Sequence, residues 1–237
     1  MPQKPQVSGL LTKLGAACLS EAAVGEPLTN EQPAVILLVM LGTPTRDRAA
    51  ERRTATRREI LGAAWEVGRD QGLAQITLRD VAHRVGMRAP SLYSHFESKN
   101  AIYDAMFADA WTECLAVMRT TADKTPSNAR ASIRLYSRTF FDFAVSDLAR
   151  HQLMNQRTIP GFEPTPEAYA PAVATLEGLH THLAKYDVTR KEDVDLCIAL
   201  VGGLIDAQLA NDPGGDRYSR LLDRAVDMYA DNLGLPA

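Results

Sequence analysis

Residues 77–99 read TLRDVAHRVGMRAPSLYSHFESK, and this stretch predicts two short helices joined at Gly86. The first, over residues 78–85, repeats apolar side chains at the i, i+3, i+4, i+7 spacing of one helix face. Thr77 stands where an N-cap belongs, with Asp80 three residues later as a weak capping partner. We expect Gly86 to end this helix, because glycine adopts the left-handed conformation after a helix without steric cost.

The second helix of this stretch, around residues 90–96, is about two turns long and offers only Leu92 and Phe96 to a core. Its other face is polar and includes Arg88, Ser91, Ser94 and His95. A short helix that is too polar to be core, propped on another by a tight glycine turn, is the geometry of helix-turn-helix DNA recognition.

The same stretch resembles the signature of the TetR family of bacterial transcription regulators. The matching segments are ITLRDVA at 76–82, GMRAPSLYSHF at 86–96 and SK at 98–99, with REILGAAW at 58–65 and GL at 72–73 similar to the family's first helix and following turn. The resemblance covers roughly residues 54–107. One departure is Arg88, which stands where the family more often has a Ser or Thr that caps the recognition helix.

Composition is that of an ordinary globular protein, with 46% hydrophobic and 23% charged residues. The three cysteines (Cys18, Cys114 and Cys197) are widely spaced, and neither a disulfide framework nor a metal site follows from them. A reducing cytosol is the simpler interpretation, so we expect a cytoplasmic protein without metal or cofactor.

Charge is unevenly distributed along the chain. Residues 45–99 carry 11 Lys and Arg against 7 Asp and Glu, whereas residues 100–237 carry 13 against 19. A basic segment beside an acidic one suits a DNA-binding head on a body that phosphate repels, although the excess is also within ordinary surface variation.

Residues 1–44 differ from the rest, with scattered prolines and no sustained helical period. We interpret them as a disordered or misassigned extension, with translation starting at Met40. Their apolar run at 35–41 is far shorter than the roughly 20 residues of a membrane span, so no membrane association is expected. Residues 45–58 form a basic arm that is either a solvated helix face or a grip on DNA phosphates.

After Lys99 the pattern is helical nearly to the end. We expect helices over about residues 99–120, 128–143, 148–156, 166–186, 191–210 and 217–233, and we find no period-2 strand pattern. The predicted architecture is all-α, with a three-helix helix-turn-helix DNA-binding domain at 45–100 and a larger C-terminal domain at 101–237.

The residues predicted to contact DNA surround the second short helix. Arg88, Ser91, Ser94 and His95 are candidates for base edges, and Ala89 and Pro90 for a thymine methyl group. Arg88 serves equally well as a phosphate contact, and His95 as a half-buried structural residue. Tyr93, with its ring packed inward, and Thr77 at a helix N-terminus are candidates for phosphates. The family resemblance supports Tyr93 and adds Lys99.

The resemblance also implies that two chains pair through their last two helices into a four-helix bundle. The matching residues are Ile198, Val201, Gly202, Ile205, Leu222, Val226 and Tyr229, each of which is equally suited to an internal core. The aromatic and methionine residues of the C-terminal domain either form plain core or line a ligand cavity. The candidates for such a cavity are Trp111, Tyr136, Phe140, Met154, Tyr169 and His180.

The leading interpretation is a homodimeric repressor that binds a near-palindromic double-stranded operator and leaves it when a small-molecule effector binds, a mechanism implied by the resemblance. The alternatives are a ligand-independent DNA binder, an activator, or a helical small-molecule-binding enzyme. The chain has no G-x-S-x-G, H-E-x-x-H or Gly-rich phosphate loop, which argues against an enzyme.

Overall fold

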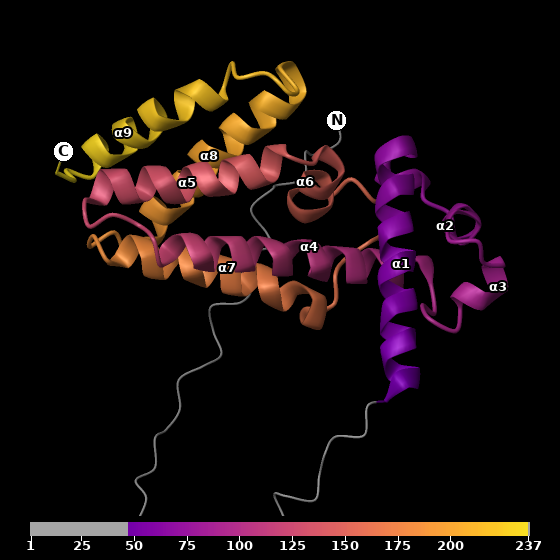
Figure 1. The fold of residues 1–237 in the computed structure, drawn as a ribbon. Helices are drawn as coiled ribbons and strands as arrows, with labels where there is room; N and C mark the ends of the chain where they lie inside the picture. The colour runs from indigo at the N-terminus through magenta and orange to yellow at the C-terminus, as the bar shows by residue number, and fades with distance from the viewer. Residues whose placement is uncertain (1–46, 237) are drawn as a thin grey trace, which may run out of the picture. The chain divides into compact units, whose positions relative to one another are not determined.

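A computed structural model describes residues 47–236 of the chain, and their helices are arranged as in Figure 1. The predictions for residues 1–44, and the first two residues of the basic arm, lie outside the described residues. The described part of the chain contains α-helices, two short 3₁₀ turns and no strand, so the all-α prediction is confirmed. The elements are α1 (Arg48–Gln71), η1 (Leu73–Gln75), α2 (Leu78–Arg84), α3 (Ala89–Leu92), α4 (Lys99–Ala122), α5 (Ala129–Val145), α6 (Leu148–Asn155), α7 (Pro166–Ala184), α8 (Lys191–Asn211), η2 (Ser219–Leu221) and α9 (Leu222–Asn232).

The basic segment before the first predicted helix belongs to α1. Asp47 caps this helix by accepting hydrogen bonds from the backbone N–H groups of Ala49 and Ala50, both at 3.0 Å. The first turns of α1 are exposed, and burial begins at Ile60. The segment is therefore helical with mostly exposed arginines, and its contact with DNA phosphates stays a prediction.

The helix-turn-helix forms as its sequence predicts, with one difference in length. Gly86 has φ +68°, the left-handed conformation expected after α2. The regular part of the second helix, α3, has only four residues. Beyond it the chain continues in tight turns, in which the His95 N–H donates to the Leu92 carbonyl at 2.8 Å. The two-turn helix predicted over residues 90–96 is therefore too long, because these turns replace its second half.

Two helices of similar length, α4 and α7, run side by side through the molecule (Figure 1). Near their starts, Asp104 of α4 accepts hydrogen bonds from the backbone N–H (2.7 Å) and hydroxyl (2.8 Å) of Thr165, the N-cap of α7. Further along, the rings of Phe107 and Tyr169 stack with centroids 5.8 Å apart. The two helices therefore run in the same direction, from the helix-turn-helix into the C-terminal bundle.

Buried apolar side chains form two clusters. The first joins α1, α2 and α3 to α4, α6 and α7, and it includes Ile60, Leu92 and Ile102, each 0% exposed. The second joins α5, α8 and α9, and it includes Phe141 and Leu222. Because α4 begins at Lys99 and packs its first turns beneath the helix-turn-helix, the first cluster extends across residue 100, where we expected the boundary between domains.

Three ion pairs, here called the ladder, connect α5 to α9. Arg130, Arg134 and Arg138 follow one another at four-residue spacing on α5, and they pair with Asp231, Asp227 and Asp223 on α9. The Arg130 guanidinium also donates to the backbone carbonyls of Asp227, Leu235 and Pro236. The ladder sets the register of α9 against α5.

Candidate nucleic-acid interface

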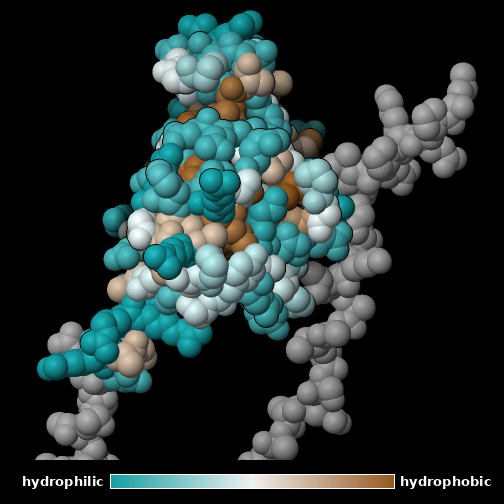
Figure 2. Space-filling view, turned by 90° about the vertical axis from the view of Figure 1, so that its right-hand side faces the viewer, coloured by the Kyte–Doolittle hydropathy of each residue, from teal (hydrophilic) through white to brown (hydrophobic). Residues whose placement is uncertain are grey.

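The residues predicted to contact DNA surround α3, and most of them are exposed. Thr77, Arg88, Pro90, Ser91, Tyr93 and Ser94 are exposed, and Ala89, His95 and Lys99 are half-buried. Figure 2 looks onto the side of the molecule where α2 and α3 lie, and the surface there is mostly hydrophilic. A polar, exposed helix held over a buried apolar cluster is what insertion into a DNA groove requires.

Arg88 is the N-cap residue of α3 and makes no side-chain capping hydrogen bond. The absence of a Ser or Thr at this position therefore leaves α3 without a side-chain N-cap. The guanidinium is exposed at the start of the helix, the end whose residues contact base edges in helix-turn-helix proteins.

Tyr93 is 58% exposed, so the prediction that its ring packs inward is wrong. Leu92 and Phe96, 0% and 2% exposed, fill the inward positions of this turn. Tyr93 lies between them at the C-cap of α3 and faces solvent. An exposed phenol hydroxyl can donate a hydrogen bond to a phosphate oxygen.

His95 is half-buried, and its two ring nitrogens differ. Its Nδ1 atom is buried and has no hydrogen-bond partner among the described residues. Only the opposite edge of the ring, with Nε2, can therefore reach a base.

Thr77 is the N-cap of α2, as predicted: its Oγ1 accepts a hydrogen bond from the Asp80 N–H at 3.2 Å. The Thr77 hydroxyl in turn donates to the Asp80 carboxylate at 2.5 Å. Asp80 therefore contacts the capping side chain of Thr77. Its carboxylate places a negative charge in the first turn of α2, where a phosphate would also have to lie.

Two arginines of α1 hold the end of residues 88–96, here called the recognition segment, a role that the sequence did not indicate. The Arg53 Nη2 atom donates to the Ser94 carbonyl at 3.3 Å, and the Arg57 Nη1 atom donates to the His95 carbonyl. The signal in the sequence is their four-residue spacing, which puts both on one helix face. What the sequence lacks is the identity of the neighbouring carbonyls.

The residues proposed to line a ligand cavity divide into two groups. Trp111, Tyr136, Phe140, Met154 and Tyr169 lie in the first apolar cluster or pack against it. His180 is exposed on α7, so it does not lie with them. The Trp111 Nε1–H is buried without a hydrogen-bond partner among the described residues.

Burial strongly shifts the pKa values of Tyr136 and its neighbour His182. The pKa of Tyr136 is raised to about 12, first because burial disfavours the phenolate and second because of Cys114 nearby. Its ring stacks on that of His182, with centroids 4.3 Å apart, and burial lowers the pKa of His182 to about 4. Both groups are therefore neutral at physiological pH, inside the bundle.

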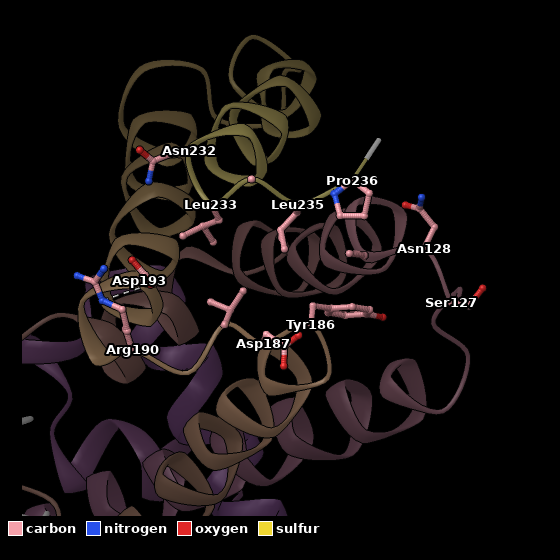
Figure 3. A pocket seen from close by; sticks show the side chains of 13 residues that line it. Ser127, Asn128, Tyr186, Asp187, Arg190, Asp193, Asn232, Leu233, Leu235 and Pro236 are labelled. Atoms are coloured by element: carbon pink, nitrogen blue, oxygen red, sulfur yellow. Dashed lines mark ion pairs between the residues drawn. The ribbon is translucent and has the colours of Figure 1, made fainter.

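Two surface hollows of the described structure are lined by none of the six cavity candidates. The first, of about 660 Å³, is formed by the tail after α9 and the ends of α7 and the α4–α5 loop. Figure 3 shows Leu233 and Leu235 on one side of it and Tyr186 and Asp187 on the other. The second, of about 580 Å³, lies between α1 and α6, where Arg69 pairs with Asp147 at 2.7 Å.

Most of the residues proposed for the dimer interface are buried within the single chain. Val201, Ile205, Leu222, Val226 and Tyr229 are between 0% and 6% exposed, as members of the second apolar cluster. Ile198 and Gly202 are half-buried. The five buried residues are internal core, because α8 and α9 turn these stripes toward each other and α5.

The outward sides of α8 and α9 carry other residues than those proposed for the dimer interface. Leu196 of α8 and Met228 of α9 are 46% and 63% exposed, and Leu221 of η2, just before α9, is 39% exposed. Gly203 is exposed, and a Cβ atom built on it would meet nothing within 4 Å. These side chains are the apolar surface that the two helices present to solvent.

No helix among residues 47–236 is long and apolar enough to cross a membrane. The same residues contain no group of three or more His, Cys, Asp and Glu side chains placed to hold a metal ion.

The geometry around α3 defines the class of protein: a helix-turn-helix DNA-binding protein with a large helical C-terminal region. Residues 60–106 match the family model described as "Bacterial regulatory proteins, tetR family". The chain therefore carries an N-terminal DNA-binding domain of the kind found in TetR-family transcriptional regulators.

Three similar proteins illustrate the relationship. The chain is 25% identical over 158 residues to the HTH-type transcriptional regulator Rv1816 of Mycobacterium tuberculosis, covering 62% of this chain and 67% of that protein. It is 31% identical over 102 residues to the HTH-type transcriptional activator FasR of Mycolicibacterium smegmatis, covering 43% and 46%. The fold is similar to that of the transcriptional regulator FadR from Bacillus subtilis in complex with stearoyl-CoA, with a TM-score of 0.61 and 15% identity over 73% of this chain and 96% of that one.

Proposed function

We propose that this regulator is a homodimeric repressor, which binds a near-palindromic operator and leaves it when a small molecule binds in the C-terminal domain. The observation that carries the proposal is the exposed polar surface around α3, held on a buried apolar cluster and beside the basic first turns of α1. Because a bacterial chromosome lies in the cytoplasm, we infer a cytoplasmic location.

Base reading falls to the residues at the start and outer face of the recognition segment. Arg88 is the strongest candidate, because a guanidinium can bind the O6 and N7 atoms of guanine in bidentate fashion. Ser91, Ser94 and the Nε2 edge of His95 are the other polar candidates, and Ala89 and Pro90 can contact a thymine methyl group.

Phosphate contacts fix the register on the duplex. Tyr93 lies within the recognition segment and Lys99 follows it. Thr77 lies at the start of α2, where a phosphate would have to displace the Asp80 carboxylate from the Thr77 hydroxyl. Arg48 and Arg52 are exposed on α1, one turn apart, and we add them as phosphate contacts. Each phosphate neutralised makes binding more sensitive to salt.

Dimerisation is proposed through the outward sides of α8 and α9. Leu196, Leu221 and Met228 provide apolar surface, and Gly203 allows a second backbone to approach closely. Two heads held by such a bundle would meet half-sites about 34–36 Å apart, one helical turn of DNA. Met228→Arg, which puts a charge on this surface, is expected to yield monomers in sedimentation velocity. A dimer that persists in this variant would place the interface elsewhere.

The effector is proposed to enter among the aromatic and methionine side chains between α4, α5 and α7. The likeness of fold to FadR, which is described with stearoyl-CoA, supports an effector with a large apolar part. Such a ligand lowers operator affinity only to the extent that it prefers the released conformation.

An activator is the second candidate, and the relative named as the activator FasR favours it. Deleting the gene separates the two functions. Transcripts from the bound promoter are expected to rise when a repressor is lost and to fall when an activator is lost.

Fluorescence anisotropy on DNA from the gene's own promoter region tests specific binding. We expect tighter binding to this DNA than to a scrambled duplex at two salt concentrations, and a sharp loss for Arg88→Ala and Tyr93→Ala. No binding to either duplex at low salt would contradict the proposed function.

A further inference from the structure

The recognition segment has little structure of its own to hold it in place. Regular helix extends over only four residues, and Arg88 gives it no side-chain N-cap. A helix this short is unstable in isolation, because nucleation costs more than so few hydrogen bonds return. Its orientation must therefore come from contacts with neighbouring elements.

Arg57 of α1 provides several of these contacts at once. Its Nη1 donates to the His95 carbonyl, and its guanidinium carbon lies 4.0 Å from the centroid of the Phe96 ring. The Phe96 ring is 2% exposed, within the apolar cluster beneath α3. Arg57 is itself half-buried, and Arg53, one turn earlier, donates to the Ser94 carbonyl.

The helix that carries Arg57 is firmly anchored. One turn beyond Arg57, Ile60 is 0% exposed, and Ala64 is 0% exposed in the turn after that. The carbonyls of Ser94 and His95 lie at the negative end of the recognition segment, where a cation is favourable. A charge-assisted hydrogen bond and a stacked ring therefore tie the end of the segment to a fixed helix.

We infer that Arg57 is a positioning residue for sequence-specific DNA binding: it fixes residues 93–96 against α1, so that α3 meets the DNA groove in one orientation. This inference rests on the proposed role of α3 in reading DNA. It assigns to Arg57 a function through His95 and Phe96, whereas the exposed Arg52 acts on phosphates directly.

The two roles predict different responses to salt. Loss of a residue that neutralises a phosphate lowers affinity for all sequences alike and reduces the slope of log affinity against log salt by about 0.9. Loss of a residue that positions α3 lowers affinity for the preferred sequence alone and leaves the slope unchanged.

The experiment uses the full chain and a duplex that the wild-type protein enriches from a randomised library, with a scrambled duplex beside it. For Arg57→Met, which keeps side-chain length and removes the donors, we expect affinity for the enriched duplex to fall about tenfold or more, as for the loss of a charge-assisted hydrogen bond. Affinity for the scrambled duplex and the salt slope should stay as in the wild type. Arg57→Lys keeps the charge without the planar stacking group, so its affinity for the enriched duplex should lie between those of the wild type and Arg57→Met.

Arg52→Met and Arg119→Met are the matched comparisons. Arg52→Met should weaken both duplexes and reduce the slope, and Arg119→Met, an exposed residue in the last turn of α4, should change neither. Circular dichroism at the assay temperature verifies folding. If Arg57→Met does not fold, the same comparison of duplexes is made on Arg57→Lys.

Three outcomes would overturn the inference. Equal losses on both duplexes with a reduced slope would make Arg57 a phosphate contact. Wild-type affinity in Arg57→Met, or in Arg57→Lys where only that variant folds, would leave it without a role. Failure of the wild-type protein to enrich any sequence would overturn the base-reading function itself, and this inference with it.

Discussion

The recognition helix α3 and the last helix α9 are both held by arginines from a neighbouring helix, but with very different support beneath them. In α9, the ladder from α5 lies beside Leu222, Val226, Tyr229 and Ala230, all between 0% and 3% exposed. In α3, Leu92 is the one buried residue. Since each buried apolar side chain contributes about 1.5–3 kcal/mol, α9 is fixed by burial, and its ion pairs add register. The orientation of α3 depends far more on a few polar contacts.

The largest effect is expected from the removal of a buried apolar side chain in α9. Leu222→Ala should lower the free energy of unfolding by about 2–5 kcal/mol, because the removed side chain is 0% exposed and its site cannot fully collapse. Urea unfolding followed by circular dichroism measures it. Leu135→Ala, at a 38% exposed position on α5, is the control and should cost less than about 1 kcal/mol. Equal losses in the two variants would refute the view that burial holds α9.

A second prediction concerns pH and the bundle that supports α9. The pKa of His182 is lowered from 6.5 to about 4, chiefly by burial and further by Lys185. Between these values the unfolded chain binds a proton that the folded chain refuses, so stability falls as pH drops from 6.5 toward 4. Below pH 4, where this loss is complete, His182 lowers the free energy of unfolding by roughly 3 kcal/mol.

His182→Phe keeps a ring against Tyr136 and cannot be protonated. The difference between its unfolding free energy and that of the wild type should shift in its favour as pH falls from 6.5 to 4, and should be constant above pH 7. A difference that does not change with pH would mean that His182 takes up its proton in the folded state as readily as in the unfolded one.

Loss of the N-cap of α2 tests the helix-turn-helix side of the comparison. Thr77→Ala removes the acceptor for the Asp80 N–H and should cost about 1 kcal/mol of stability. Thr77→Ser retains the hydroxyl and serves as the control, with stability close to the wild type. Thermal unfolding of the three proteins measures the effect, and no difference between Ala and Ser at this position would show that the cap is dispensable.

The smallest effect is expected for the middle rung of the ladder. Arg134 and Asp227 have side chains 40% and 33% exposed, and a pair this open contributes only about 0.2–1 kcal/mol. Arg134→Met should therefore destabilise far less than Leu222→Ala, and the loss should shrink further in 1 M salt because exposed charges are screened. A loss as large as that of Leu222→Ala would show that the ion pairs hold α9 in place.

Much of the fold follows from local signals in the sequence. The sequence predicts helices that begin near residues 99 and 128, and Ser98 and Asn128 cap them: each accepts a hydrogen bond from the N–H three residues later, at 3.1 and 2.9 Å. Gly86 was expected to end α2, and its φ of +68° agrees. These features depend on a few consecutive residues, so no knowledge of the tertiary structure was needed.

Features that depend on the neighbouring element could not be predicted in the same way. The sequence does not reveal that Leu92 and Phe96 leave Tyr93 outside, or that the carbonyls beside Arg57 belong to the recognition segment. In α8 both faces carry apolar residues, so periodicity alone did not distinguish the buried Ile205 from the exposed Leu196. The sequence therefore points to the inward stripe for the dimer interface, whereas the outward one remains open to a second chain.

Two copies of α3 are proposed to read DNA as a symmetric pair. The most direct test of this pairing is selection of bound duplexes from a randomised library by the full-length protein, followed by sequencing. We predict two copies of one short motif in opposite orientations, with centres about one helical turn apart, and Arg88→Ala should relax the preference at one position of each copy. Enrichment of no sequence, or of a motif that Arg88→Ala selects unchanged, would contradict paired base reading by α3.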